Sequence, residues 1–292
     1  MSTKTLDSAP SSIPQFIRAG FGALPGTGHL PFLAGGGGEI PDLELALDGV
    51  TVDSDRLAEY CQVCEFTLRD TLPATYPHVL AFPLHMALLT DSSFPFPAIG
   101  MVHIANRIVL HRPIRVAEEL SLRVRAENLQ PHPKGKTFTL VSEARVGEEL
   151  VWEGQSTNLR RGGGSGESAS KPAAGEAAEL REQAEWKLRG DLGRRYGGVS
   201  GDRNPIHLYG LTAKAFGFKS QIAHGMWTKA RCLAALEPRL PDSYAVEVAF
   251  KRPILLPGKV VFSSADADDG GIDFGVSSKR DDTPHLAGSV AA

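Results

Sequence analysis

The sequence predicts an α+β protein of two similar halves, each with helices followed by an antiparallel sheet. Apolar residues have helical spacing over residues 53–64 and 76–89, and from Met101 they follow the two-residue period of strands. The same order returns after residues 161–178, which hold too few large apolar residues to form a core. His111–Ile114 (His-Arg-Pro-Ile) and Lys251–Ile254 (Lys-Arg-Pro-Ile) stand at equivalent points between strands. We therefore predict a duplication, with repeats over residues 41–160 and 179–292 and a linker over residues 161–178.

Length and composition are typical of a globular enzyme. The 292 residues exceed the common size of one domain, and 42% of them are hydrophobic while 22% are charged. A net charge of −3, spread along the chain, gives no electrostatic footprint for nucleic acid or an anionic membrane. No apolar run has the length of a membrane span, and the N-terminus lacks the apolar segment of a secretion signal. We expect a cytoplasmic protein with no nucleic-acid partner.

The first half begins with a segment that is not expected to fold. Residues 1–40 are rich in Ser, Pro and Gly and indicate a flexible arm. A half-buried strand follows over residues 42–48, and Asp53 or Ser54 caps a helix that runs to about Cys64. A second helix over residues 76–89 contains Pro83, which has no backbone N–H to donate, so we expect a kink or break near Phe82.

The cysteines do not form a disulfide framework. The chain has three, Cys61, Cys64 and Cys232, and the first two form a Cys-x-x-Cys pair. Redox chemistry or half of a zinc site are the alternatives. No second Cys/His pair at ligand spacing accompanies this one, and it lies within a helical pattern, so we interpret both residues as small buried apolar groups.

In the second half, residues 196–207 place unusual chemistry in a loop: Tyr-Gly-Gly-Val-Ser-Gly-Asp-Arg-Asn-Pro-Ile-His. Asn204 before Pro205 is typical of a helix start, which puts His207 in the first turn and Asp202 just outside it. A carboxylate and an imidazole that converge there are suited to acid–base catalysis. One alternative is a capped helix with a surface histidine.

Two further alternatives for this loop concern other chemistries. Ser200 would give a hydrolase nucleophile, but Gly198–Gly201 lacks the strand-to-helix turn of such enzymes. A metal site on Asp202 and His207 lacks a third ligand in the sequence.

A second candidate feature opens a helix over residues 224–236. The free N–H groups of a helix start, beside Gly225, are suited to binding a carbonyl oxygen or an oxyanion. The alternative is that Gly225 only permits close packing. His224 is interpreted as a satisfied core or loop histidine.

Together these residues resemble a known family. Tyr196-x3-Ser-Gly-Asp-x-Asn-Pro-x-His207, followed by Ala213, Phe216-Gly217 and Ile222–Met226, is similar to the MaoC-like (R)-specific enoyl-CoA hydratases. Residues 77–127 resemble the degenerate partner repeat of double-hotdog hydratases, especially the actinobacterial (3R)-hydroxyacyl-thioester dehydratases. The resemblance covers nearly everything from about residue 40 onward and implies two tandem hotdog repeats, each an antiparallel sheet wrapped around a central helix.

The resemblance also implies a reaction and its residues. Asp202 and His207 correspond to the catalytic dyad, Asn204 orients it, and the Gly225 N–H binds the thioester carbonyl. The expected reaction is reversible hydration of trans-2-enoyl thioesters, or dehydration of (3R)-hydroxyacyl thioesters, in fatty acid metabolism, without metal or cofactor. In the degenerate repeat, Cys64-Glu65-Phe66 stands where Gly-Asp would be, so we expect one active site per chain.

The carrier, the chain length and the assembly stay open at this point. The substrate is expected on coenzyme A or on acyl carrier protein, and a homodimer is one open assembly. An apolar tunnel for medium or long acyl chains is expected in the first repeat, with ordinary core as the alternative; its candidates are Phe82, Met86, Phe94 and Phe96. Candidates for a carrier phosphate, which otherwise face water, are Lys214, Lys219, Lys251 and Arg252. The competing function is a non-catalytic acyl-thioester-binding subunit of a larger dehydratase complex.

Overall fold

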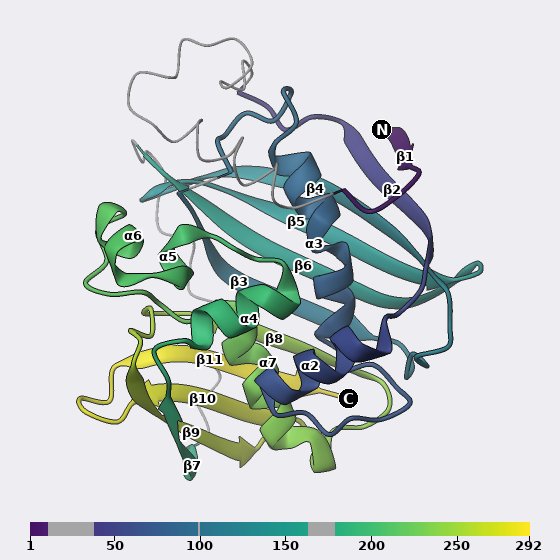
Figure 1. Ribbon diagram of the computed structural model, residues 1–292. Coiled ribbons are helices and arrows are strands. Elements are labelled where there is room, and N and C mark those ends of the chain that lie inside the picture. Colours follow the sequence, from purple (N-terminus) through teal and green to yellow (C-terminus); the bar gives the residue numbers. More distant parts are fainter. Residues whose placement is uncertain (11–37, 99, 163–178) are drawn as a thin grey trace.

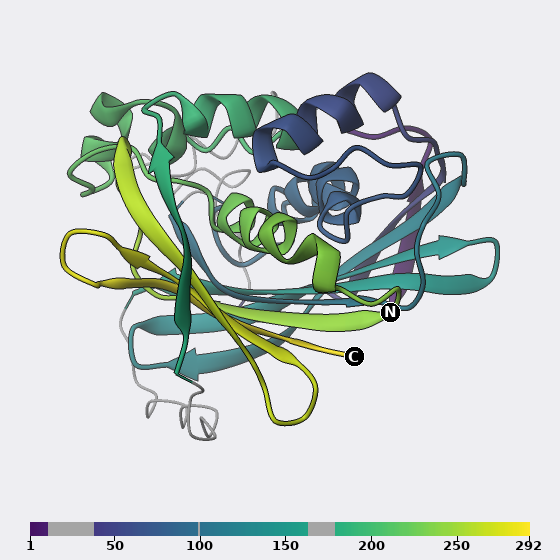
Figure 2. The ribbon, with the colours of Figure 1, turned by 90° about the horizontal axis from the view of Figure 1, so that it is seen from below.

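The computed structural model describes residues 1–10, 38–98, 100–162 and 179–292 (Figure 1). Within these ranges eleven strands form a single sheet in the order β1-β2-β4-β5-β6-β3-β8-β11-β10-β9-β7. The helices lie on one face of the curved sheet, with α3 and α7 against it and α2 and α4 farther out (Figure 2). The fold is therefore α+β, as predicted.

The two repeats have the same order of elements. The first contains β2 (Leu43–Val50), α2 (Ser54–Cys64), α3 (Tyr76–Leu89), β3 (Met101–Leu110), β4 (Leu120–His132), β5 (Gly135–Val146) and β6 (Glu149–Arg161). The second contains β7 (Arg181–Leu188), α4 (Leu192–Ser200), α5 (Pro205–Leu208), α6 (Gly210–Ala215), α7 (Gly225–Leu236), the 3-10 turn η2 (Glu237–Arg239), β8 (Tyr244–Phe250), β9 (Gly258–Asp266), β10 (Ile272–Ser278) and β11 (Pro284–Ala291).

Strand pairing confirms the duplication. Each half of the sheet reads outward from the centre in the same way, β3-β6-β5-β4-β2 on one side and β8-β11-β10-β9-β7 on the other, and antiparallel pairing of β3 with β8 joins them. The two related tetrapeptides follow β3 and β8. In each, the last residue accepts a backbone hydrogen bond, from Leu72 to Ile114 and from Ala223 to Ile254.

The prediction of a flexible arm is wrong at its start. Residues 2–6 form β1 (Ser2–Leu6), which pairs in parallel with β2, and the N-terminal ammonium contacts the Asp42 carboxylate at 2.7 Å. Without β1 the strand β2 would be a sheet edge with unpaired backbone groups, so covering it satisfies both segments. The rest of the predicted arm over residues 11–37, and the linker over residues 163–178, lie outside the described residues.

Of the two helices in the first repeat, α2 begins as the sequence predicts, whereas α3 differs from the prediction. Asp53 caps α2, and its carboxylate accepts from the N–H groups of Asp55 and Arg56. Helix α3, however, runs unbroken through Pro83, so the predicted break does not occur. The lost hydrogen bond and the clash cost about 3 kcal/mol. Most side chains of α3 are buried, and this packing offsets that cost. Cys61, Cys64 and Cys232 are buried free thiols, as predicted.

A buried lysine connects α7 to the junction of the repeats. Lys229 is fully buried, and its ammonium donates to Asn106 Oδ1 at 2.6 Å, to the Asn106 carbonyl at 3.3 Å and to the Val246 carbonyl at 3.1 Å. Asn106 lies on β3 and Val246 on β8, so Lys229 contacts both repeats. Its three donors have three acceptors, which limits the cost of burying it. Burial lowers the pKa of Lys229 well below its ordinary value.

Two glycines let α4 approach the segment that follows it. A Cβ atom on Gly193 would lie 1.9 Å from the His207 carbonyl oxygen, and one on Gly197 would lie 2.8 Å from the Asp202 carbonyl oxygen. Such separations are far inside van der Waals contact, so larger residues would force the segment over residues 202–207 away from α4. Gly198, on the same helix, has open space around it.

We expect Asn106→Leu to lower the free energy of unfolding by about 1.5 to 3 kcal/mol, because it leaves a buried ammonium without its shortest partner. Lys229→Met in the Asn106→Leu background should recover part of this loss, because both polar partners are then gone. Urea denaturation measures both effects. A wild-type midpoint for Asn106→Leu would contradict the assigned role of Lys229.

We expect Gly193→Ala to lower the free energy of unfolding by about 1 to 3 kcal/mol through overpacking against His207. Gly198→Ala on the same helix is the matched control, and it should raise stability by about 0.5 to 1 kcal/mol because alanine is the better helix former. The same denaturation experiment compares the two. Equal shifts for the two variants would show that α4 does not pack as closely as described.

Candidate active site

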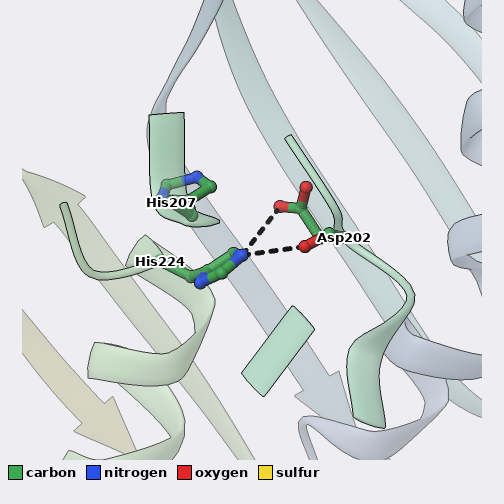
Figure 3. A group of neighbouring side chains, drawn as sticks. All are labelled: Asp202, His207 and His224. Carbon is green, nitrogen blue, oxygen red and sulfur yellow. Dashed lines mark hydrogen bonds and ion pairs between the residues drawn. The ribbon is translucent and has the colours of Figure 1, made fainter. Parts of the chain in front are cut away.

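Three side chains from three segments of the second repeat meet between α4 and α7 (Figure 3). Asp202 lies between α4 and α5, His207 lies on α5, and His224 directly precedes α7. One carboxylate oxygen and one nitrogen of each imidazole all lie within 4.8 Å of one another. The structure therefore brings Asp202 and His207 together, as the motif predicts, and adds His224.

The hydrogen bonds of His207 fix its tautomer. Its Nδ1 lies 2.8 Å from the Ile222 carbonyl oxygen, which only accepts, so Nδ1 carries the hydrogen. Burial lowers the pKa of His207, against the opposing effects of the Asp202 charge and the Ile222 hydrogen bond. The ring is thus neutral near pH 7, and Nε2 holds a lone pair. No described residue hydrogen-bonds to Nε2, so His207 offers a free base.

His224 supports the other two residues. Its Nε2 donates to the Asp202 backbone carbonyl at 2.9 Å and lies 3.8 Å from Oδ2 of the same residue. Its ring stacks on His207, with 3.7 Å between centroids. Burial, and then the nearby His207, lower the pKa of His224 to about 3. His224 is thus a buried histidine with one satisfied nitrogen, and its Nδ1 is buried without a partner among the described residues.

Asp202 is oriented mainly by backbone groups. The Asn204 N–H donates to Asp202 Oδ1 at 3.1 Å, and the Asp202 N–H donates to Ser200 Oγ at 3.2 Å. The Asn204 side chain instead caps α5 by accepting from the Ile206 N–H. The cap interpretation of Asn204 is therefore confirmed, whereas its role in orienting a catalytic pair stays a prediction. Ser200 accepts from the loop backbone, and no described imidazole hydrogen-bonds to it, so the site does not have the geometry of a serine hydrolase.

Gly225 is the first residue of α7, next to His224. The first N–H groups of a helix have no partner within it, and the positive end of the helix dipole lies there. A Cβ at this position would lie 3.0 to 3.1 Å from three ring carbons of Phe250 on β8. A glycine here therefore lets α7 begin close against the sheet.

The geometry favours proton transfer over metal binding. Lone pairs of imidazole lie in the ring plane, and the His207 and His224 planes are inclined by only 24°. Two stacked rings cannot both direct a lone pair at one ion at about 2.0 to 2.1 Å unless one of them turns. His224 Nε2 is also engaged with the Asp202 carbonyl. The absence of a metal stays a prediction.

The equivalent position in the first repeat has no carboxylate. Helix α4 ends at Gly201 in the left-handed conformation, with φ 78°, and α2 ends at Glu65 in the same conformation, with φ 62°. The next residues are Asp202 and Phe66, and the Phe66 ring stacks on Tyr60. The dyad thus occurs in the second repeat alone among the described residues.

The structure separates the expected acyl-chain residues into two groups. Met86 and Phe82 pack together in a small cluster with Ala98. Phe94 and Phe96 instead contact Phe138 in the main core. An apolar tunnel along all four residues stays a prediction. The expected phosphate ligands are all exposed: Lys214, Lys219, Lys251 and Arg252.

No helix among the described residues combines the length and the apolar character that a membrane crossing requires.

Comparison with known proteins gives a consistent result. Residues 173–276 match the family model of the MaoC like domain. The chain is 35% identical over 282 residues to the 3-hydroxyacyl-thioester dehydratase X of Mycobacterium tuberculosis, covering 96% of this chain and 98% of that protein.

Solved structures agree with this. The crystal structure of HtdX from the same organism has a TM-score of 0.75 at 35% identity, covering 85% of this chain and 98% of that one. A further M. tuberculosis protein, described as a double hotdog, has a TM-score of 0.55 at 15% identity, covering 84% of this chain and 94% of that one, which shows the fold alone. The paired repeats, the retained motif and the full-length similarity together show that this chain belongs to the MaoC-like dehydratases of the double-hotdog type.

Proposed function

We propose that the protein catalyses reversible addition of water to trans-2-enoyl thioesters, which in reverse is dehydration of (3R)-hydroxyacyl thioesters. The observation that carries this proposal is the convergence of the Asp202 carboxylate with the imidazole of His207, whose Nδ1 is held by Ile222, beside the start of α7. The mycobacterial 3-hydroxyacyl-thioester dehydratase X is similar over nearly the whole chain and supports it.

The residues divide the reaction into three tasks. In hydration, His207 Nε2 accepts a proton from a water molecule that the Asp202 carboxylate also holds. The water oxygen bonds to C3, and the C2–C3 π electrons move toward the thioester carbonyl. The Gly225 N–H donates to the thioester carbonyl oxygen and stabilises the enolate charge there. The Asp202–His207 pair then delivers one proton to C2, so the net reaction adds one water.

The proposal extends to the carrier of the acyl substrate and to the cellular location of the protein. Coenzyme A and acyl carrier protein present the same phosphopantetheine thioester, and the exposed Lys214, Lys219, Lys251 and Arg252 are candidates for contacts with its phosphate. A cytoplasmic location is supported by three buried cysteines that remain free thiols. A homodimeric assembly stays a prediction.

We expect Asp202→Asn and His207→Gln each to lower kcat by about 10² to 10⁴, the usual contribution of acid–base catalysis. The assay follows loss of enoyl absorbance with trans-2-enoyl-CoA, and the unfolding midpoint checks that each variant folds. Asp242→Asn, which changes an exposed carboxylate, is the matched control and should keep wild-type activity.

Two outcomes of this assay would favour other functions. Wild-type protein that consumes no enoyl thioester on either carrier would favour the non-catalytic binding subunit. Release of free thiol, detected with a thiol reagent, would instead indicate a hydrolase.

We expect the acidic limb of the kcat/KM profile to lie below pH 6.5, the ordinary value for histidine. The reason is that burial lowers the pKa of His207, and the base is active only when neutral. As the pH falls through 6.5 the ring therefore stays unprotonated and activity persists. The profile of kcat/KM reports the ionisation of the free enzyme. A limb above pH 6.5, with the fold intact by circular dichroism, would argue against His207 as the base.

A further inference from the structure

A second group of imidazoles, two of them buried and the third half-buried, lies in the first repeat and has no part in the proposed reaction. His78 and His85 lie on α3, and His103 lies on β3. The ring centroid of His78 lies 5.0 Å from that of His85 and 6.4 Å from that of His103. These three residues form the histidine cluster.

An irregularity in β3 aims His103 at this cluster. The buried residues Asn106, Ile108 and Leu110 define the face of β3 that points toward the helices. In a regular strand, His103 would therefore point the other way. The pairing of β3 with β6 shifts register between His103 and Ala105. A β-bulge of this kind changes the direction of side chains, and bulges are frequent near active sites.

The cluster has unused hydrogen-bonding capacity. His85 Nε2 contacts Ser142 Oγ at 2.7 Å, whereas His103 Nε2 is buried without a partner among the described residues. An unpaired buried polar atom costs about 1 to 3 kcal/mol relative to a paired one. Nearly all such atoms in native proteins have partners, so one beside an active site indicates a group that binds there.

The cluster reaches the proposed active site through one aromatic ring. Phe250 lies 5.0 Å from His103 between centroids, and the same ring packs on Gly225. His103 is also near enough to Asp202 for its charge to affect the imidazole. Phe250 therefore links the start of α7 to the cluster, and an acyl chain whose thioester carbonyl is held at Gly225 would have to follow this ring to reach the cluster.

The chemistry of the cluster selects a neutral partner. Burial is the largest cause that lowers the pKa of all three rings, to about 3 for His85 and about 4 for His103. Each neutral ring offers one donor and one acceptor. Lys229, the nearby cation, has its three donors engaged with Asn106 and Val246, so no free positive charge is available for an anion.

We propose that the acyl chain of the substrate carries a hydroxyl or oxo group beyond the reacting carbons, and that His103 binds this oxygen together with His78 and His85. The inference rests on the proposed function and makes the histidine cluster a determinant of specificity, in a region where the sequence predicts an apolar tunnel.

The test uses trans-2-enoyl-CoA thioesters of one chain length. One is unsubstituted, and the others carry a single oxo or hydroxyl group at successive carbons beyond C4. The full-length protein is compared with His103→Leu, with His78→Leu as a second variant should His103→Leu fail to fold. His111→Leu, which changes an exposed histidine paired with Glu153, is the matched control.

We expect wild-type protein to have a higher kcat/KM for at least one oxygenated substrate than for the unsubstituted one. His103→Leu should lower this ratio about tenfold, as expected for loss of one buried hydrogen bond. The unfolding midpoint of His103→Leu should equal or exceed the wild-type value, because the variant removes an unpaired buried nitrogen. His111→Leu should leave the ratio unchanged.

A ratio that is unchanged in both cluster variants, or a wild type that prefers the unsubstituted chain, would overturn this inference while leaving the hydratase function intact. Protein that turns over neither kind of substrate would overturn the proposed function, and the inference with it.

Discussion

The position of helix α7 is the constraint on which the rest of the site depends. This helix begins with Gly225 beside Phe250, and one turn later Lys229 donates to Asn106 on β3 and Val246 on β8. A fully buried ammonium tolerates little displacement, because each lost acceptor exposes an unpaired charge to a low-dielectric interior. The start of α7, and with it His224, is thereby fixed relative to the junction of the two repeats.

The two repeats share the same backbone arrangement but carry different side chains at equivalent positions. Helices α2 and α4 both end in a left-handed residue, Glu65 and Gly201, but the chain then continues with Phe66 in one and Asp202 in the other. Phe66 stacks on Tyr60 and extends the core, whereas Asp202 meets His207 and His224. The difference between Phe66 and Asp202 at equivalent positions thus accounts for one proposed site per chain. Helix α3 of the first repeat is then available for another role.

Local features of the fold could be predicted from the sequence, and features that depend on distant contacts could not. The Asp53 cap and the start of α5 at Pro205 require only their neighbours, so propensity and capping rules identify them. The continuity of α3 through Pro83 depends on burial by the sheet, and β1 depends on an open edge of β2. The spacing of Asp202 and His207 fits a capped helix as well as a catalytic pair, and it is the resemblance of the whole motif to a known family that favours the pair. The interpretation of His224 as a core or loop histidine agrees with its burial and with its Nε2 hydrogen bond to Asp202. Its stacking on His207 brings together segments that are apart in the sequence, so local rules do not predict it.

Burial keeps the rings of both imidazole groups neutral, and the two groups differ in the partners that surround them. His207 needs a low pKa and one free lone pair, and its Ile222 hydrogen bond leaves Nε2 as that lone pair. The histidine cluster needs neutral rings with capacity to spare, which burial also provides, but no nearby carboxylate in hydrogen-bonding contact. Phe250 stands between the two and contacts both Gly225 and His103. A phenyl ring has no group that donates or accepts a proton, so Phe250 itself offers no proton path between the dyad and the cluster.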